Sequence, residues 1–301
     1  MQKMDYHNPV LLKQSVDGLE IDPNGIYVDV TFGGGGHSKE ILKRLGDEGR
    51  LYAFDQDEEA FQNKIKDNRF ELIHGNFKYI KRFLRVYGVT KVNGILADLG
   101  VSSHQFDVAA RGFSTRFDAV LDMRMDTNSE LSAYDILNNY DEESLQNLLF
   151  NYGELRNAKA LAKTIAGARE IEPIKTSFQL KEILKRFLPN NKAHKIMAQI
   201  FQAIRIEVNQ ELEVLKEFLL QTPDLLVSGG KLSVISYHSL EDRLVKRFFK
   251  NGIFSGEPDK DFYGNTDTPF KKSEKLIIPT NEEIKINNRA RSAKLRIVAR
   301  K

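Results

Sequence analysis

The sequence predicts an α/β fold in which a doubly wound, parallel sheet is interrupted by an inserted all-helical domain. Over the first hundred residues, short β-branched, apolar runs alternate with helical patterns in units of about 20 to 30 residues. Glycines and acidic residues follow these runs, at the strand ends where such sheets bind ligands. About 130 residues then separate the fourth predicted strand from the fifth, far more than one helical crossover needs.

Four apolar runs, each followed by a turn or a helical pattern, predict the first part of the sheet. We expect strands at 26–30, 50–57, 69–77 and 92–100, with helices at 37–46, 58–66 and 77–88 between them. Asp57 follows the second run and is expected to cap the next helix. The crossovers between these strands should be right-handed.

Helical patterns dominate the middle of the chain. We expect an insert for substrate recognition at 107–198, a main domain of 1–106 and 199–301, and a long helix near 193–221 that re-enters the main domain. The insert could bind RNA or form a homodimer contact. The expected elements that follow are a strand at 229–237, a helix at 239–250, a polar loop at about 254–273, and final strands at KLIIP (275–279) and AKLRIVAR (293–300).

Composition narrows the classes of function. The 301 residues include no cysteine, which excludes disulfides, thiolate metal sites and a cysteine nucleophile. No apolar run is long enough for a transmembrane helix, and the polar N-terminus is unlike a signal peptide, so we expect a cytoplasmic protein with no membrane partner. The net charge is only +3, but basic clusters at 243–250 and 285–301 could attract a phosphate backbone.

The stretch DVTFGGGGHS (29–38) predicts a ligand-binding turn after the first strand. Gly33 and Gly35 fit the first two positions of the dinucleotide fingerprint, but Ser38 occupies the third, and no Gly-Lys-Ser/Thr follows to make a Walker P-loop. A dinucleotide and S-adenosylmethionine remain as ligands. Either would place ribose hydroxyls against a carboxylate after the second strand, for which Asp55 is the candidate. A tight turn without a ligand is the alternative.

LADLGVSSHQ (96–105) closes the fourth strand and supplies a second carboxylate. Amino-methyltransferases commonly place a short polar–apolar motif there, and Asp98 could accept a hydrogen bond from an exocyclic amine. The alternative is a buried carboxylate that pairs with backbone amides.

Nine segments together resemble the bacterial 16S ribosomal RNA (cytosine-N4)-methyltransferases. They occur in order over nearly the whole chain: HNPVLL (7–12), DVTFGGGGHS (29–38), FDQD (54–57), ADLGVSSHQ (97–105), RGFS (111–114), LDMRMD (121–126), FQAIRIEVNQEL (201–212), ISYHSLEDRLVK (235–246) and NRARSAKLR (288–296). The sequence departs from the family at Val30, Leu155 and Asn288, where Gly, Glu and Pro are usual.

The resemblance implies a Rossmann-like methyltransferase sheet, S-adenosylmethionine as cofactor, and methylation of N4 of a cytidine in 16S rRNA or the 30S subunit. With Gly33 from the fingerprint added, the implied cofactor contacts are Gly33, Gly35, Gly36, His37, Asp55, Phe77, Asp98 and Gln105. Phe77 could flank the adenine or belong to the core.

Methyl transfer from a sulfonium needs no metal, so catalysis should rest on alignment and on Asp98 as the acceptor that polarises the amine. Tyr237, after the fifth strand, could border the base, and His238, Ser239 or Arg243 could contact the base edge or a phosphate. Tyr237 could instead be core and His238 a loop residue. The residues expected to bind RNA are Arg111, Arg243, Arg289 and Arg291.

Two other functions remain open at this stage. The first is a non-catalytic RNA-binding or ribosome-assembly protein that keeps a methyltransferase fold. The second is an NAD-type oxidoreductase, which would need a hydride-transfer acid and pyrophosphate contacts that nothing in the sequence supplies. A DNA methyltransferase is disfavoured, because 98–101 reads Asp-Leu-Gly-Val in place of an Asn/Asp-Pro-Pro-aromatic motif.

Overall fold

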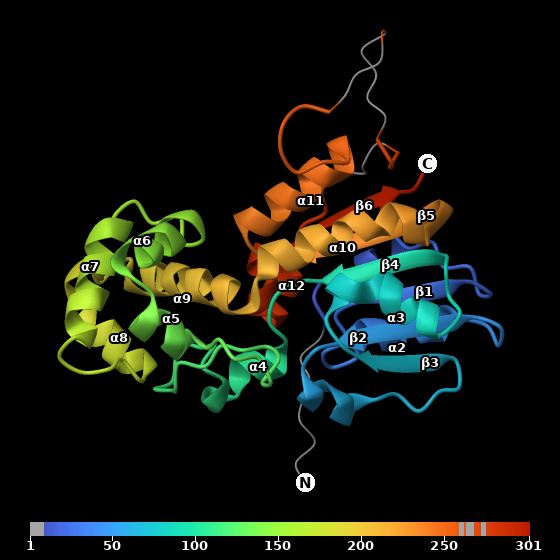
Figure 1. Cartoon of the computed structure of the whole chain (residues 1–301). Helices are drawn as coiled ribbons and strands as arrows, with labels where there is room; N and C mark the ends of the chain where they lie inside the picture. The colour runs from blue at the N-terminus through green and yellow to red at the C-terminus, as the bar shows by residue number, and fades with distance from the viewer. Residues whose placement is uncertain (1–8, 259–261, 263–267, 272–274) are drawn as a thin grey trace. The chain divides into compact units, whose positions relative to one another are not determined.

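The computed structural model describes residues 9–258, 262, 268–271 and 275–301 (Figure 1). Residues 7 and 8 of the HNPVLL segment and much of the predicted polar loop at 254–273 lie outside this range. The chain divides into two compact units. The sheet unit comprises Met1–Gly100 and Leu212–Lys301, and the helical unit comprises Val101–Glu211, so its bounds are wider than the 107–198 expected for the insert.

Six strands form one sheet in the order β3-β2-β1-β4-β5-β6. The strands are β1 (Ile26–Asp29), β2 (Arg50–Asp55), β3 (Phe70–His74), β4 (Val92–Asp98), β5 (Leu226–Ser236) and β6 (Lys294–Ala299). The first five strands are parallel, as predicted, and β6 departs from that pattern by pairing antiparallel with β5. The strand order reverses between β1 and β4, which is the switch point of a Rossmann-like sheet, so the predicted fold class is confirmed.

Helices cover both faces of the sheet, and consecutive residues of β4 are buried on opposite faces, with Ile95 and Ala97 in one core cluster and Leu96 in another. On one face lie α3 (Ile80–Val86), α10 (Glu211–Leu225) and α11 (Ser239–Asn251), which contribute Leu84, Phe218 and Phe248 to one core cluster. On the other face lie α1 (Leu12–Asp17) and α2 (Gly36–Arg44), whose Val16 and Ile41 belong to a second cluster. Full burial of each such side chain stabilises the fold by about 1.5–3 kcal/mol.

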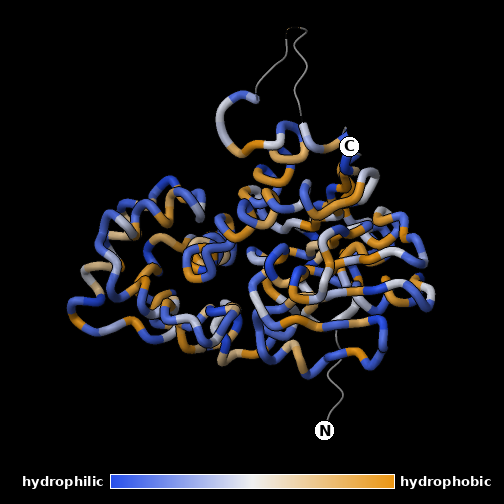
Figure 2. Tube along the Cα trace, turned by 45° about the vertical axis from the view of Figure 1, so that its right-hand side comes forward, coloured by the Kyte–Doolittle hydropathy of each residue, from blue (hydrophilic) through white to orange (hydrophobic). Residues whose placement is uncertain are grey.

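The helical unit has a separate apolar core. Its helices are α4 (Ser103–Asp107), α5 (Ala133–Asn139), α6 (Glu142–Asn151), α7 (Ala158–Arg169), α8 (Ser177–Ile183) and α9 (Ala193–Asn209). Leu161 and Ile165, one turn apart on α7, are fully buried in this core. Hydrophilic and hydrophobic stretches alternate along the helices of this unit (Figure 2). No helix among the described residues is both long and apolar enough to span a bilayer.

The single helix predicted near 193–221 is wrong, because α9 and α10 are separate helices. Gln210 lies between them in a left-handed conformation with φ of 50°. The Asn209 side chain donates to the Met123 carbonyl at 2.8 Å, and the Arg205 guanidinium pairs with Glu211 at 2.8 Å. These side-chain contacts fix the break where the chain leaves the helical unit.

Two shorter elements also differ from the prediction. The segment after β2 is a 3-10 helix, η1 (Glu58–Asn63), in place of an α-helix. The predicted KLIIP strand is reduced to one isolated bridge between Ile277 and Leu295, and it leads into α12 (Asn281–Ile286) and η5 (Asn288–Ser292).

Candidate active site

Three aspartates end neighbouring strands of the sheet unit. Asp29, Asp55 and Asp98 are the last residues of β1, β2 and β4, and Tyr237 directly follows β5. Since β2, β1, β4 and β5 are adjacent and parallel, their carboxyl ends share one edge of the sheet. This edge is the candidate active site.

The glycine turn between β1 and α2 is shaped by close packing. Gly33 and Gly35 have left-handed φ values of 51° and 73°. A Cβ atom at Gly35 would lie 2.9 Å from the Phe32 ring, and one at Gly36 would lie 2.1 Å from Cγ of Pro9. These glycines therefore bring the backbone at the start of α2 close to the strand ends, where the positive end of a helix favours anionic groups.

The segment at 9–11 supports this turn from outside. Pro9 packs against Gly36, and the Val10 carbonyl lies 3.2 Å from Nε2 of His37. The Leu11 amide donates to Oε1 of Glu283 in α12 at 2.6 Å. The turn is thus tied to a helix near the other end of the chain.

Asp55 accepts hydrogen bonds from two backbone amides. Gly33 N–H donates to Oδ2 at 2.8 Å, and Asp57 N–H donates to Oδ1 at 2.9 Å. Burial raises the pKa of Asp55 to about 6, although both amides act to lower it. Asp57 caps η1 by accepting from the Glu59 amide at 3.1 Å, which confirms its predicted role.

Asp29 is a site residue that sequence reasoning missed. It is fully buried and accepts from Ser38 Oγ at 2.7 Å and from the Thr31 amide at 3.1 Å. Ser38 thus replaces the third glycine of the fingerprint with a hydroxyl donor for Asp29. Burial raises the pKa of Asp29. Its position as the last residue of an apolar run before the glycines was the available signal.

Asp98 lies between a tyrosine and a histidine. Its Oδ1 accepts from the Tyr237 hydroxyl at 2.7 Å, and its Oδ2 lies 3.7 Å from Nδ1 of His37. Because Nε2 of His37 faces the Val10 carbonyl, which can only accept, Nε2 carries a hydrogen and a neutral ring presents a bare Nδ1 to Asp98. Burial raises the pKa of Asp98 to about 6, while the charge of a protonated His37 ring and the hydrogen bond from Tyr237 act to lower it.

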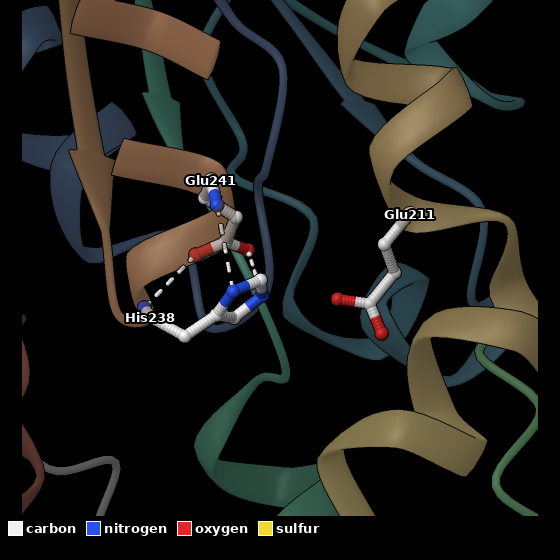
Figure 3. Close-up of side chains that lie close together, drawn as sticks. All are labelled: Glu211, His238 and Glu241. Atoms are coloured by element: carbon white, nitrogen blue, oxygen red, sulfur yellow. Dashed lines mark hydrogen bonds and ion pairs between the residues drawn. The ribbon is translucent and has the colours of Figure 1, made fainter. Parts of the chain in front are cut away.

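The turn after β5 is organised by Glu241, the second site residue that was missed. Its Oε2 accepts from the Tyr237 amide at 2.9 Å, and the His238 imidazole faces its carboxylate, with Nε2 to Oε1 at 3.2 Å (Figure 3). His238 also caps α11 by accepting from the Glu241 amide at 3.4 Å. A capping-box spacing in HSLE (238–241) was the available signal.

Phe77 begins a short 3-10 helix, η2 (Phe77–Tyr79), in the loop after β3. Its half-buried ring packs edge-on against Phe218, with centroids 5.3 Å apart. Asn76 donates from Nδ2 to Oε1 of Gln56 at 2.8 Å, which links the loops after β2 and β3. Phe77 therefore has a packing role, and its contact with a cofactor stays a prediction.

Gln105 and Arg111 belong to the helical unit. Gln105 is buried and accepts from the Ser102 amide at 3.0 Å in the capping box of α4. Arg111 is 6% exposed, and its guanidinium donates to the Arg124 and Met125 carbonyls at 2.9 and 3.2 Å. This burial gives Arg111 a framework role, so we do not include it in an RNA-binding surface.

The basic clusters are partly neutralised within the sheet unit. Lys294 and Arg296 both pair with Asp242, at 3.1 and 2.7 Å. The side chains of Arg243 and Arg291 are exposed, and Arg289 is half-buried.

Comparisons with known proteins agree over the full chain. The model of the MraW methylase family matches residues 4–301. The chain is 66% identical to a ribosomal RNA small subunit methyltransferase H of Christiangramia forsetii, over 99% of this chain and 98% of that protein. It is 67% identical to the Flavobacterium psychrophilum protein of the same name (97% and 100% covered) and 57% identical to that of Cytophaga hutchinsonii (98% and 99% covered).

Proposed function

Because this chain belongs to the MraW methylase family, we propose that it methylates N4 of a cytidine in the 16S rRNA of the small ribosomal subunit. It is an S-adenosylmethionine-dependent methyltransferase. Asp98 is the observation that supports an amine substrate. Its carboxylate is a hydrogen-bond acceptor at the switch point of the sheet, and the Tyr237 hydroxyl holds that carboxylate in place. The oxidoreductase alternative is set aside, because the relatives are methyltransferases.

The residues at the strand ends fit the cofactor. Asp55 has only two amide donors and a pKa raised to about 6, so the two hydroxyls of a ribose would stabilise its charged form. The backbone at Gly35, Gly36 and His37, at the start of α2, suits the carboxylate of the amino-acid tail. Phe77 would flank the adenine. When bound, S-adenosylmethionine supplies a methyl group on a positively charged sulfonium.

Asp98 would act on the amine of the base. The Tyr237 hydroxyl occupies Oδ1, which leaves Oδ2 to accept a hydrogen bond from the exocyclic N–H. That bond keeps electron density on the nitrogen and orients it, so alignment accounts for most of the rate. Asp98 then accepts the proton that the nitrogen loses, and solvent removes it. His37, 3.7 Å from Oδ2, stabilises the carboxylate when its ring is protonated.

RNA would reach this edge through the loops after β5 and before β6. Tyr237 borders the target base, which must leave its stack to meet Asp98. Arg243, Arg289 and Arg291 would bind phosphates, with His238 and Ser239 near the base edge. We infer that the protein acts in the cytoplasm, where it would meet a ribosomal substrate.

Mass spectrometry of nucleosides from small-subunit rRNA tests this proposal. Purified protein and S-adenosylmethionine are incubated with unmodified 16S rRNA or with assembled 30S subunits. We expect 4-methylcytidine in at least one arm with the wild-type protein and, at the same early time point, about 10²–10³-fold less of it with Asp98→Ala. Equal nucleoside profiles with and without wild-type protein in both arms would contradict the proposal.

A further inference from the structure

We propose that a cavity beside Tyr237 binds one nucleotide that flanks the target cytidine in the RNA chain, an inference that rests on the proposed function. The cavity has a volume of about 320 Å³ and lies wholly within the sheet unit. This volume is within the range of about 300–1,000 Å³ that is usual for small-ligand sites. Its lining includes Tyr237, Ile278, Ile284, Arg291 and Lys294.

The cavity is distinct from the group of strand-end carboxylates. Neither the aspartates at the strand ends nor the glycine turn lines it. Tyr237 is the link, because it lines the cavity and its hydroxyl lies 2.7 Å from Asp98. A ligand in the cavity would thus lie beside the residue that donates to the acceptor Asp98, which suits a neighbour of the target base.

The lining combines an apolar wall with cationic side chains. Ile278 is 62% exposed, and Pro279 and Ile284 complete the wall. Among the described residues Arg291 has no acidic partner, whereas the Lys294 ammonium lies 3.1 Å from Asp242. A nucleotide matches both features, since its base has an apolar face and its phosphate pairs with a guanidinium. A bare phosphate would leave the isoleucine wall unused.

Methyl NMR of protein labelled at the isoleucine δ1 carbons tests for the site without any turnover. Cytidine 5′-monophosphate is titrated into the full chain, with ribose 5-phosphate and inorganic phosphate as comparison probes. We expect saturable shifts of the Ile278 and Ile284 signals with the nucleotide, and shifts at least fivefold smaller with the other two. Ile286, which is 72% exposed and does not line the cavity, is the matched control. Unchanged Ile278 and Ile284 signals, or equal shifts at Ile286, would overturn the proposal.

Substitution of Arg291 tests whether the cavity contributes to binding of the rRNA substrate. We expect Arg291→Ala to weaken nucleotide binding and to raise KM for the rRNA substrate about tenfold, with kcat changed less than twofold. Arg85→Ala removes the same charge from an exposed position of the sheet unit, outside the cavity and outside both basic clusters, and should leave both values at wild-type level. A KM unchanged by Arg291→Ala contradicts the inference.

These two experiments separate this inference from the proposed function. Nucleotide shifts at Ile278 in a protein that modifies no rRNA would support the cavity and refute the function. Normal rRNA methylation by a protein whose Ile278 and Ile284 signals do not shift with the nucleotide would support the function and refute the cavity site.

Discussion

The strand-end carboxylates of the sheet unit differ from an ion-paired aspartate of the helical unit. In the sheet unit, burial raises the pKa values of Asp29, Asp55 and Asp98, and Asp29 raises those of the other two further. In the helical unit, Asp122 has a lowered pKa, because the Arg124 guanidinium binds both its oxygens, at 2.9 and 2.8 Å. The charged forms of these three strand-end carboxylates are thus disfavoured by their surroundings, whereas Asp122 has a guanidinium as its counterion, as Asp242 of the sheet unit has in Arg296.

This difference indicates what each set of residues does. Groups whose environment opposes their charge are typical of sites that await a ligand, whereas a fully paired group stabilises a scaffold. The helical unit follows the second pattern elsewhere, since Ser132 caps α5 together with Asp135, and Asn138 bridges to the Ile174 backbone. The predictions below test whether the two patterns behave differently.

Removal of the Asp98 carboxylate should give the largest effect. Asp98→Ala is expected to lower the rate of methyl transfer by about 10²–10³-fold, because one aligned acceptor is lost. RNA affinity should stay within twofold in a binding assay. Near wild-type turnover would contradict the role of Asp98. The strand-end carboxylates would then lack the catalytic role that distinguishes them from Asp122.

Activity should fall as the site carboxylates gain protons. Asp55 and Asp98 have pKa values of about 6, so both are mostly protonated at pH 5 and mostly ionised at pH 7. Single-turnover rates at saturating RNA should therefore be about tenfold lower at pH 5 than at pH 7. A profile that is flat over this range would argue against ionised carboxylates as the active form.

Neutralising one aspartate in each unit should shift stability in opposite directions. The raised pKa of Asp98 means that folding free energy is lost as pH rises from 3.8 towards about 6. Asp98→Asn should therefore stabilise the ligand-free protein at pH 7. The gain is at most about 2 kcal/mol, because solvent screens a partly exposed carboxylate, and no gain is expected at pH 3. Asp122→Asn should instead destabilise it at pH 7. Urea unfolding across this pH range measures the change in unfolding free energy of both variants. Changes of the same sign would contradict the contrast between Asp98 and Asp122.

The smallest expected effect is that of a cap in the helical unit. Ser132→Ala removes the acceptor for the Asp135 amide and should cost about 1 kcal/mol of stability. Methyl transfer per folded molecule should remain at the wild-type level, as the activity assay can verify. A loss of activity larger than the loss of folded protein would show that the helical unit does more than provide a scaffold.

The strand ends of the sheet were predictable because they depend on local patterns. An apolar run followed by a glycine or a carboxylate places Gly33, Asp55 and Asp98 at one edge once the strands are parallel. The break at Gln210 was not predictable in this way, because it depends on Asn209 reaching a carbonyl 86 residues earlier in the chain. A left-handed glutamine has no local signature.

Contacts of the candidate site were harder to predict than its residues. The pairing of Asp98 with both Tyr237 and His37 joins three elements that are far apart in sequence. Ser38 looked like a defect in a glycine fingerprint until its bond to Asp29 was seen. The residues of β6 likewise do not indicate that the strand is antiparallel, because buried parallel and antiparallel strands can have the same apolar pattern.

The hydrogen bond between the Leu11 amide and Glu283 has a consequence for biosynthesis. It joins positions 272 residues apart, and the segment that it anchors also supports Gly36 and His37. A ribosome must therefore translate past codon 283 before this brace on the glycine turn can form. A nascent chain that already holds β1 to β4 would still lack this contact, so we expect the glycine turn to reach its final form late in folding.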